Sequence, residues 1–329
     1  MMTFYGLREG RLVRLSTAST SILPALTEVL WIDLLDPSHD EEKAVETLLA
    51  LQIPTRQEMA EIEESSRLYE DHGALVMTAV VIDGAGEGRP ARTQVTFVLT
   101  QTHLVSVRYA DPVPFRTFEA KCQRQPELHT SSDRILASLL DSIVERAADV
   151  LELIAADLNE VSVRLFFDEE PRRRPKRAED ELQILIKRLG RRNMTMAILR
   201  ESVLSLSRLG PFLRQGTSAW LTDDGTRRLK MIERDLRSLS AYEGQLSSEI
   251  VYLHEATLGL INLAQNRIIK VFSIAAVLFL PPTVVGTIYG MNFETMPELK
   301  WAFGYPFALL MMALSAALPY YWFKRKGWL

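Results

Sequence analysis

The stretch VFSIAAVLFLPPTVVGTIY, residues 271–289, carries no charged side chain, and neither does the stretch YPFALLMMALSAALPYYWF, residues 305–323. Each has 19 residues, and a helix needs about 20 predominantly apolar residues to cross a bilayer. Both lie far from the N-terminus, which has charges where the apolar part of a signal peptide would be. The sequence therefore predicts a C-terminal hairpin of two transmembrane helices, over residues 268–290 and 305–323.

Charged residues flank the hairpin unevenly. Arg267 and Lys270 precede the first span, and the tail 324–329 begins with Lys-Arg-Lys. The loop 291–304 contains Glu294, Glu298 and a single Lys. Because Lys and Arg accumulate on the cytoplasmic side of membrane proteins, we expect both termini in the cytoplasm and the loop outside.

One face of the first span carries small, polar or hydroxylated side chains at steps of three and four residues. Its members are Asn262, Asn266, Ile269, Ser273, Ala276, Leu280, Thr283 and Thr287. Small residues permit close helix packing, so a plain helix–helix interface is one interpretation. The other is a pore wall, in which amides and hydroxyls solvate a hydrated ion and Leu280 forms an apolar constriction. Two helices cannot enclose a channel, so a pore requires several copies around an axis.

Composition excludes several classes of protein. The 329 residues include 38 basic and 42 acidic side chains, a net charge of -4, so no overall basic field for nucleic acid exists. The single cysteine cannot form an internal disulfide, and the five histidines have no metal-ligand spacing. No phosphate-binding loop or catalytic constellation is present, and we expect neither an enzyme nor a cofactor.

The remainder of the chain predicts a cytoplasmic part. Residues 1–130 alternate short strands with helices, one of which is capped by Ser38, and indicate an α/β domain. Residues 131–267 indicate long helices, one stopped at Gly210-Pro211 and the last forming a stalk. From Leu229 to Leu260 this stalk keeps a coiled-coil-like apolar seam broken only at Glu243 and Thr257.

The end of the first span carries a motif. Tyr289-Gly290-Met291-Asn292 is followed by Phe293-Glu294, Met296-Pro297-Glu298-Leu299 and Trp301, then by the second span and its basic tail. In this position the sequence resembles the CorA family of divalent-cation channels. More loosely, the resemblance covers the whole chain.

The resemblance implies a homopentameric, funnel-shaped channel, in which an α/β cytoplasmic domain and long α-helices lead into the two-helix hairpin. Gly290, Met291 and Asn292 would form the outer mouth, and the Asn266-to-Thr287 face would line the pore. Neutral oxygens suit Mg²⁺, which dehydrates reluctantly, while Glu294 and Glu298 would concentrate cations outside. The function implied is influx of Mg²⁺, with Co²⁺ and Ni²⁺ as further cargo.

The resemblance also implies regulation by cytosolic Mg²⁺ bound between cytoplasmic domains of neighbouring subunits. Acidic candidates for this site are Asp83, Glu233 and Asp235. Two alternatives to the Mg²⁺ channel remain: a ZntB-like Zn²⁺ transporter of the same superfamily, and a membrane-anchored coiled-coil scaffold. The expected partners are other copies of the chain, membrane lipid and divalent cations, without nucleic acid.

Overall fold

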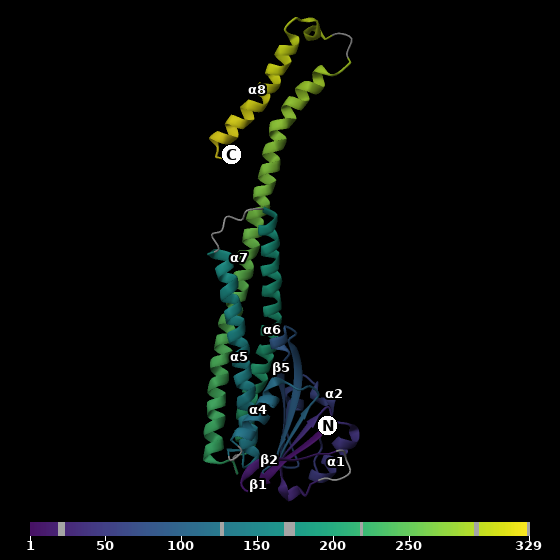
Figure 1. Cartoon of the computed structure of the whole chain (residues 1–329), viewed down its shortest axis with the longest axis vertical. Helices are drawn as coiled ribbons and strands as arrows, with labels where there is room; N and C mark the ends of the chain where they lie inside the picture. The colour runs from purple at the N-terminus through teal and green to yellow at the C-terminus, as the bar shows by residue number, and fades with distance from the viewer. Residues whose placement is uncertain (19–23, 126–127, 168–174, 218–219, 293–295, 328–329) are drawn as a thin grey trace. The chain divides into compact units, whose positions relative to one another are not determined.

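The computed structural model describes residues 1–18, 24–125, 128–167, 175–217, 220–292 and 296–327. The chain divides into two compact units, of which the first comprises residues 1–170 and 184–254 and the second residues 171–183 and 255–329. Helix α7, Asp223–Tyr289, contributes residues to both units. The first unit contains a mixed sheet and long helices, and the second contains the apolar hairpin (Figure 1).

The sheet has seven strands in the order β2-β1-β3-β7-β6-β5-β4. All neighbours are antiparallel except β3 and β7, which pair in parallel from Trp31–Leu104 to Leu35–Arg108. The strands are β1 Met2–Arg8, β2 Arg11–Ala18, β3 Val29–Leu35, β4 Leu68–Asp71, β5 Ala74–Asp83, β6 Ala91–Leu99 and β7 Leu104–Arg108. The glycine-rich segment 84–88 forms the turn between β5 and β6, with Gly84 and Gly88 at positive φ.

Short helices cover one face of the sheet. Helix α1, His39–Leu49, starts at a capping box in which Ser38 accepts a hydrogen bond from the Glu41 N–H, so the predicted N-cap is confirmed. The buried cluster on this face includes Val45 of α1 and Ile53 of the following loop. It also includes Met59, the last residue of helix α2, Arg56–Met59. Helix α3, Glu64–Arg67, leads into the edge strand β4.

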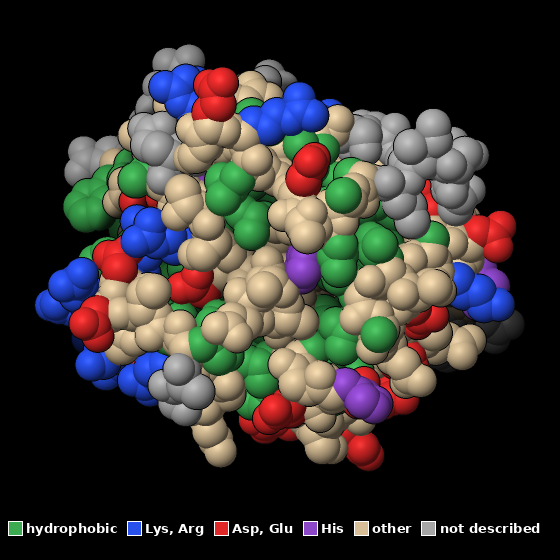
Figure 2. All heavy atoms as spheres, turned by 90° about the horizontal axis from the view of Figure 1, so that it is seen from below, with side chains coloured by type: hydrophobic (Ala, Val, Ile, Leu, Met, Phe, Trp, Pro, Cys, Tyr) green, Lys and Arg blue, Asp and Glu red, His purple; other side chains and the backbone are tan. Residues whose placement is uncertain are grey.

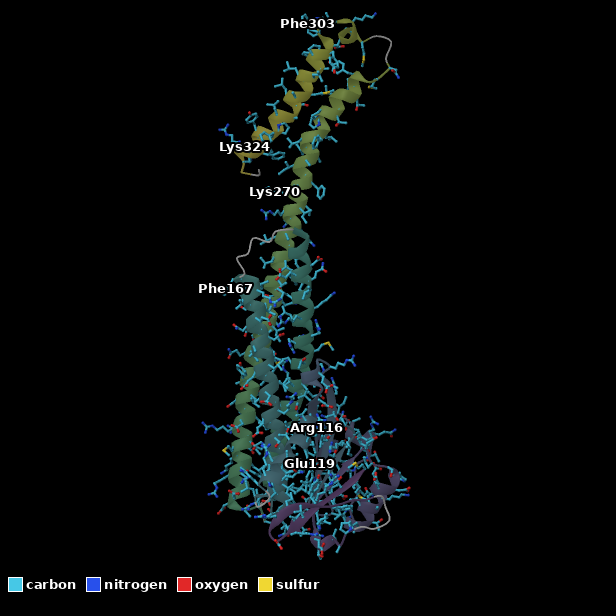
Figure 3. The ribbon with its side chains drawn as sticks, viewed as in Figure 1. Arg116, Glu119, Phe167, Lys270, Phe303 and Lys324 are labelled. Atoms are coloured by element: carbon cyan, nitrogen blue, oxygen red, sulfur yellow. The ribbon has the colours of Figure 1, made fainter. Side chains whose placement is uncertain are left out.

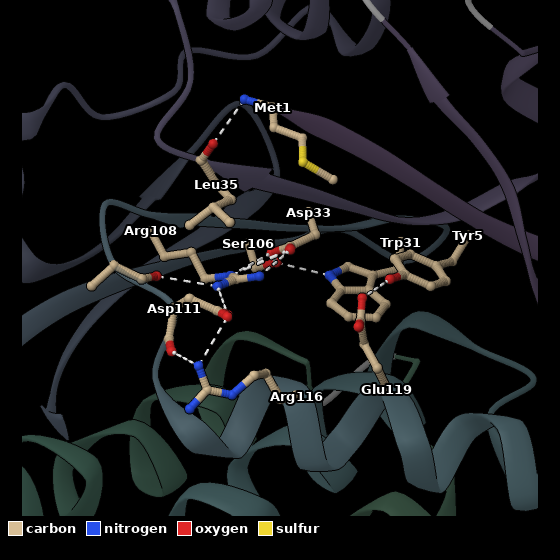
Figure 4. A network of polar contacts seen from close by, with 11 residues as sticks. Met1, Tyr5, Trp31, Asp33, Leu35, Ser106, Arg108, Asp111, Arg116 and Glu119 are labelled. Atoms are coloured by element: carbon tan, nitrogen blue, oxygen red, sulfur yellow. Dashed lines mark hydrogen bonds and ion pairs between the residues drawn. The ribbon is translucent and has the colours of Figure 1, made fainter. Parts of the chain in front are cut away.

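The opposite face is held by a buried polar network (Figure 4). The Arg108 guanidinium donates to both carboxylate oxygens of Asp33, and Ser106 donates to the same carboxylate while accepting from the Trp31 indole N–H. Arg108 also lies 4.5 Å from the ring centroid of Phe115 in helix α4, Val113–Arg124. Burial alone would lower the pKa of Arg108, but the hydrogen bonds to Asp33 outweigh it and raise that pKa. The network therefore ties β3 and β7 to α4.

Three long helices complete the first unit. They are α5, Ser132–Phe166, α6, Pro175–Gly216, and the first part of α7. Ion pairs join α5 to α6 and α6 to α7, and Phe166 stacks on Tyr252 between α5 and α7. The seam positions Glu243 and Thr257 are themselves buried, and Arg200 and Ser247 both donate hydrogen bonds to the Glu243 carboxylate.

The prediction that a helix stops at Gly210-Pro211 is wrong, because α6 runs on to Gly216. A Cβ at position 210 would lie 2.6 Å from the Glu233 side chain, so the glycine serves close packing of α6 on α7. Leu209 and Leu213 are buried on either side of Pro211. Their packing offsets the backbone hydrogen bond that the proline removes.

Acidic and basic side chains are interspersed around the end of the molecule shown in Figure 2. This mixture agrees with the near balance of 38 basic and 42 acidic residues. Local charge in the first unit is therefore a matter of individual clusters and not of a field of one sign.

We expect Asp33→Ala to lower the free energy of unfolding by about 3–5 kcal/mol, because it leaves the buried Arg108 charge without its main partner. Asp33 and Arg108 are 5% and 6% exposed. Glu64→Ala is the matched control, since it removes a carboxylate from the exposed Arg208–Glu64 pair and should cost about 1 kcal/mol or less. Denaturation of the full-length protein followed by tryptophan fluorescence measures both, and equal losses would contradict the assignment.

Candidate ion pathway

The second unit contains the end of α7 and helix α8, Gly304–Arg325. Both helices are long and apolar enough to cross a membrane, and little of either apolar window is buried by other parts of the chain. In Figure 3, Phe303 lies at the closed end of this hairpin, and Lys270 and Lys324 lie toward the other end. The basic residues that predicted the inner membrane border therefore share one end of the hairpin.

Helix α8 covers a single face of α7. On that face Ile274 is 7% exposed, and Leu278, Pro281, Val285 and Gly286 are partly buried. A Cβ at position 286 would lie 3.0 Å from the Met312 methyl group, so the glycine permits a close approach of the two helices. The interface within the hairpin is thus built from residues outside the predicted Asn262-to-Thr287 face.

The predicted face lies on the opposite side of α7. At about 100° per residue, its members are centred roughly 140° from the buried and half-buried positions Ile274, Leu278, Pro281 and Val285. All of them are exposed, with Ile269 at 60% and Leu280 at 67%; the others are Asn262, Asn266, Ser273, Ala276, Thr283 and Thr287. The face is therefore not the helix–helix interface of its own hairpin. We call these eight residues the free face of α7.

Large apolar side chains occupy the flanks of the free face. They are Phe272, Phe279 and Ile288, all at least 48% exposed. Lipid tails suit such flanks but not a strip of amides and hydroxyls, which loses hydrogen bonds to water when placed in hydrocarbon. The free face consequently requires water or other copies of the chain beside it.

The two threonines of the free face keep an oxygen available. The Thr283 hydroxyl donates to the Phe279 carbonyl at 2.7 Å, and the Thr287 hydroxyl donates to the Thr283 carbonyl at 2.8 Å. Since each proton is used within the helix, the lone pairs of the hydroxyl oxygens can accept from the water shell of a cation.

Pro281 and Pro282 do not end the helix, because α7 continues through them to Tyr289. A proline has no N–H, so the carbonyls four residues earlier, at 277 and 278, lose their helical donors. The two prolines therefore free backbone carbonyls without interrupting the helix.

The predicted mouth follows the last residue of α7. The Gly290 N–H donates to the carbonyls of Gly286 and Thr287, and the Met291 N–H donates to the Ile288 carbonyl at 3.3 Å. A Cβ at position 290 would lie 3.1 Å from the Gly286 carbonyl oxygen, which is tighter than most side chains accept. Gly290, Met291 and Asn292 are all exposed. The structure thus presents the three motif residues at the end of the same helix that carries the free face.

A short helical turn, Pro297–Lys300, and an aromatic group hold the loop before α8. The Trp301 ring contacts those of Phe303 and Phe307, with centroids 6.4 and 5.7 Å apart. Glu298 is exposed, as a cation-attracting role requires. Glu294 lies outside the described residues.

The three regulatory candidates lie in different surroundings. Asp83 ends β5 and accepts a hydrogen bond from the Gly84 N–H. Glu233 is paired with Arg214 at 3.2 Å, and Asp235 is exposed, with its charge acting on Asp141 of α5. Burial, then the nearby Glu145 carboxylate, raises the pKa of Asp141. Among the residues that the structure describes, no group of three or more His, Cys, Asp or Glu side chains could hold a metal ion within one chain.

Two features of this region were missed in the sequence. A Cβ at Gly286 would meet the Met312 side chain of α8, and a Cβ at Gly304 would meet the Glu298 backbone, so both positions require glycine. The only sequence signal for either is a glycine inside or beside an apolar stretch, and that signal does not name the contact partner.

The fold and the hairpin define a class of protein in which an α/β domain and long helices precede two apolar helices able to cross a membrane. Residues 27–325 match the family described as CorA-like Mg²⁺ transporter protein. The chain is 32% identical to the magnesium transport proteins CorA of Salmonella typhimurium and of Escherichia coli K12, over 329 residues and 100% of each chain. The chain therefore belongs to the CorA family, a family of transporters and not of enzymes.

Solved structures share this fold. The CorA magnesium transporter from Methanocaldococcus jannaschii matches with a TM-score of 0.76 at 16% identity, covering 100% of this chain and 99% of that one. Full-length CmaX matches at 0.67 and 15% identity, covering 99% and 97%. The cytoplasmic domain of ZntB from Vibrio parahaemolyticus matches at 0.52 and 11% identity, covering 79% of this chain and 97% of that domain.

We expect Gly304→Ala to disturb the loop, because its Cβ would fall 2.1 Å from the Glu298 carbonyl oxygen. Displacing that backbone should lower the melting temperature and open the loop to protease. Gly244→Ala is the control: nothing lies within 4 Å of its Cβ, and alanine in a helix interior stabilises by about 0.5–1 kcal/mol. Similar melting and cleavage for both variants would rule out this role of Gly304.

Proposed function

We propose that the chain is a subunit of a homopentameric channel for Mg²⁺ influx, with Co²⁺ and Ni²⁺ as further cargo. The observation that carries the proposal is the free face of α7, which its own hairpin leaves exposed and which leads to Gly290-Met291-Asn292. Membership of the CorA family and the magnesium transport named in its relatives support the choice of ion.

In the proposed assembly the free faces of five α7 helices surround a water-filled pore. Leu280 forms the apolar constriction, and the hydroxyl and amide oxygens hold the water shell of the ion. The Gly290 carbonyl and Asn292 amide contact those waters at the mouth, while Glu298 and Glu294 raise the local cation concentration. Neutral ligands that touch only the water shell bind Mg²⁺ weakly enough for it to leave.

The driving force is the membrane potential. A divalent ion moving inward gains about 4.6 kcal/mol per 100 mV, twice the roughly 2.3 kcal/mol for one charge. We place the hairpin in the bacterial inner membrane, with both termini on the cytoplasmic side. The basic clusters at Arg267-to-Lys270 and at 324–326 would then lie at the inner border of the membrane and attract anionic lipid.

The test is Mg²⁺ influx into liposomes containing the full-length protein and a Mg²⁺-sensitive dye. We expect influx under an inside-negative potential, and a loss of at least about tenfold in Asn292→Ala, because five subunits each lose a hydrogen bond to the ion's water shell worth about 0.5–1.5 kcal/mol. Asn193→Ala, at an exposed position of α6, should leave influx unchanged.

The alternatives give different results in the same assay. A membrane-anchored scaffold shows no influx. A ZntB-like transporter carries Zn²⁺ better than Mg²⁺ and responds to an imposed proton gradient. Because the fold also matches a ZntB cytoplasmic domain, the assay includes Zn²⁺ and a proton gradient. Equal influx in wild type and Asn292→Ala would exclude the proposed mouth.

We further propose that cytosolic Mg²⁺ closes the channel by binding acidic side chains between neighbouring subunits, with Asp83, Glu233 and Asp235 as candidates. Asp83 and Asp235 form no ion pair with Lys or Arg within the described chain, whereas Glu233 is paired with Arg214. We therefore rank Asp83 and Asp235 first.

Asp83→Asn and Asp235→Asn should relieve the inhibition of influx by Mg²⁺ loaded inside the liposomes, because each removes a ligand charge. Asp40→Asn, at an exposed position of α1, is the control. Unchanged inhibition in both variants would remove these residues from the regulatory site.

A further inference from the structure

A cavity of about 500 Å³ in the first unit is formed by residues that the proposed ion pathway does not use. It lies between the turn joining β5 to β6, helix α5 and helix α6. Its charged lining consists of Arg89, Arg188, Arg191, Arg192 and Asp157, a sum of four positive charges and one negative, or +3. In a chain with a net charge of -4, this is a concentrated local excess of positive charge.

Asp157 fixes the positions of two of the guanidinium groups. Its Oδ1 accepts from the Arg188 Nε at 2.9 Å, and its Oδ2 accepts from the Arg192 Nε at 2.7 Å. Arg188 also donates to Glu160. Burial raises the pKa of Asp157, but the hydrogen bonds from Arg192 and Arg188 outweigh it and lower that pKa. The carboxylate is therefore ionised at neutral pH and holds both guanidinium groups in place.

The other two arginines are left without such a partner. Arg89 and Arg191 are exposed, and neither forms an ion pair with a carboxylate within the described residues. Arg191 has only a long hydrogen bond of 3.4 Å, from its Nε to the Lys187 carbonyl. Counting Glu160 beside the lining, the group still keeps a charge of +2.

These features select the ligand chemistry. A divalent cation is repelled, so the cavity is not a Mg²⁺ site. Guanidinium forks match the oxygens of carboxylate and phosphate, but a single carboxylate cannot neutralise this excess of charge. A volume of about 500 Å³ is in the range of small-molecule sites and admits more than one phosphate group. An isolated pocket lacks the extended basic stripe that nucleic acid requires.

We propose that this cavity binds a small anion bearing two or more phosphate charges, through Arg188 and Arg192 held by Asp157 and through the unpaired Arg89 and Arg191. The chemistry is shared by free polyphosphates and by phosphorylated lipid headgroups. The turn that supplies Arg89 begins next to Asp83, so a residue of the proposed anion site and a candidate of the regulatory site belong to one short segment.

The test is pyrophosphate binding to the full-length protein in detergent, measured by isothermal titration calorimetry without Mg²⁺. We expect saturable binding that weakens with salt. The double variant Arg89→Gln with Arg191→Gln should lower the affinity by at least about tenfold while leaving the melting temperature unchanged, because both side chains are exposed.

The control double variant is Arg8→Gln with Arg234→Gln. These arginines are also exposed and without an ion pair in the described chain, so the same two charges are removed elsewhere. Absence of pyrophosphate binding, or equal weakening in both double variants, overturns the proposal, as does a site already filled by an acidic group of a neighbouring subunit.

Nanodiscs distinguish the two sources of the phosphate. Competition of pyrophosphate by phosphatidic acid, but not by phosphatidylcholine, assigns the cavity to a lipid headgroup. Binding that is unaffected by either lipid assigns it to a free anion. Both measurements are independent of Mg²⁺ influx, so failure of this proposal and failure of the channel proposal are separable.

Discussion

The hydrogen-bonding demand of one helix face is the constraint on which the account of this protein depends. In hydrocarbon, the asparagine amides of the free face of α7 and the lone pairs of its Thr283 and Thr287 hydroxyls would lack the partners that water provides. Helix α8 does not supply them, because the free face is exposed and the buried or half-buried positions Ile274, Leu278 and Val285 lie on another side of α7. Lipid suits the flanks at Phe272, Phe279 and Ile288 but not the strip between them. A lone hairpin in a membrane therefore leaves these groups without partners, and the proposed assembly of copies around a water-filled axis would supply them.

Charges in the first unit follow a related rule, in which buried ions are paired. Arg108 is held by Asp33, Glu243 by Arg200 and Asp157 by two arginines. Such pairs fix how strands and helices meet, since removing one partner leaves a buried charge without compensation. Exposed charges need no such partner, and an outside ligand can bind where several of them meet in one place. Asp83 and Asp235 are unpaired acids, and Arg89 and Arg191 are unpaired bases of a single cavity.

Much of the fold was accessible from the sequence because local signals were strong. The two uncharged stretches, the Ser38 cap and the glycine turn before Arg89 each have a direct physical cause in neighbouring residues. Strand β4 has no such signal, since Leu-Tyr-Glu-Asp at a sheet edge has no clear alternation and gains its order from pairing with β5. The stop expected at Gly210-Pro211 failed for the same kind of reason, because tertiary contacts with α7 outweigh local propensity.

The candidate site was predictable as a pattern but not as a set of contacts. Helical spacing alone indicated the Asn266-to-Thr287 face, but it fitted both a helix–helix interface and a pore wall. The position of α8 then excluded an interface within the hairpin. The Asp157, Arg188 and Arg192 group joins α5 to α6 across about 30 residues of sequence, and spacing gives no sign of such a pairing. Sites between subunits are further from reach, because one chain does not show which residues of its copies face it.

Thiol modification along α7 tests the central claim most directly. The single native cysteine, Cys122, is buried, and burial raises its pKa to about 12, so it should not react. We predict that a charged methanethiosulfonate added outside blocks Mg²⁺ influx in Thr287→Cys but not in Ile288→Cys, which lies about 100° around the helix. Block of both variants alike, or of Ile288→Cys alone, would contradict a pore lined by the free face of α7.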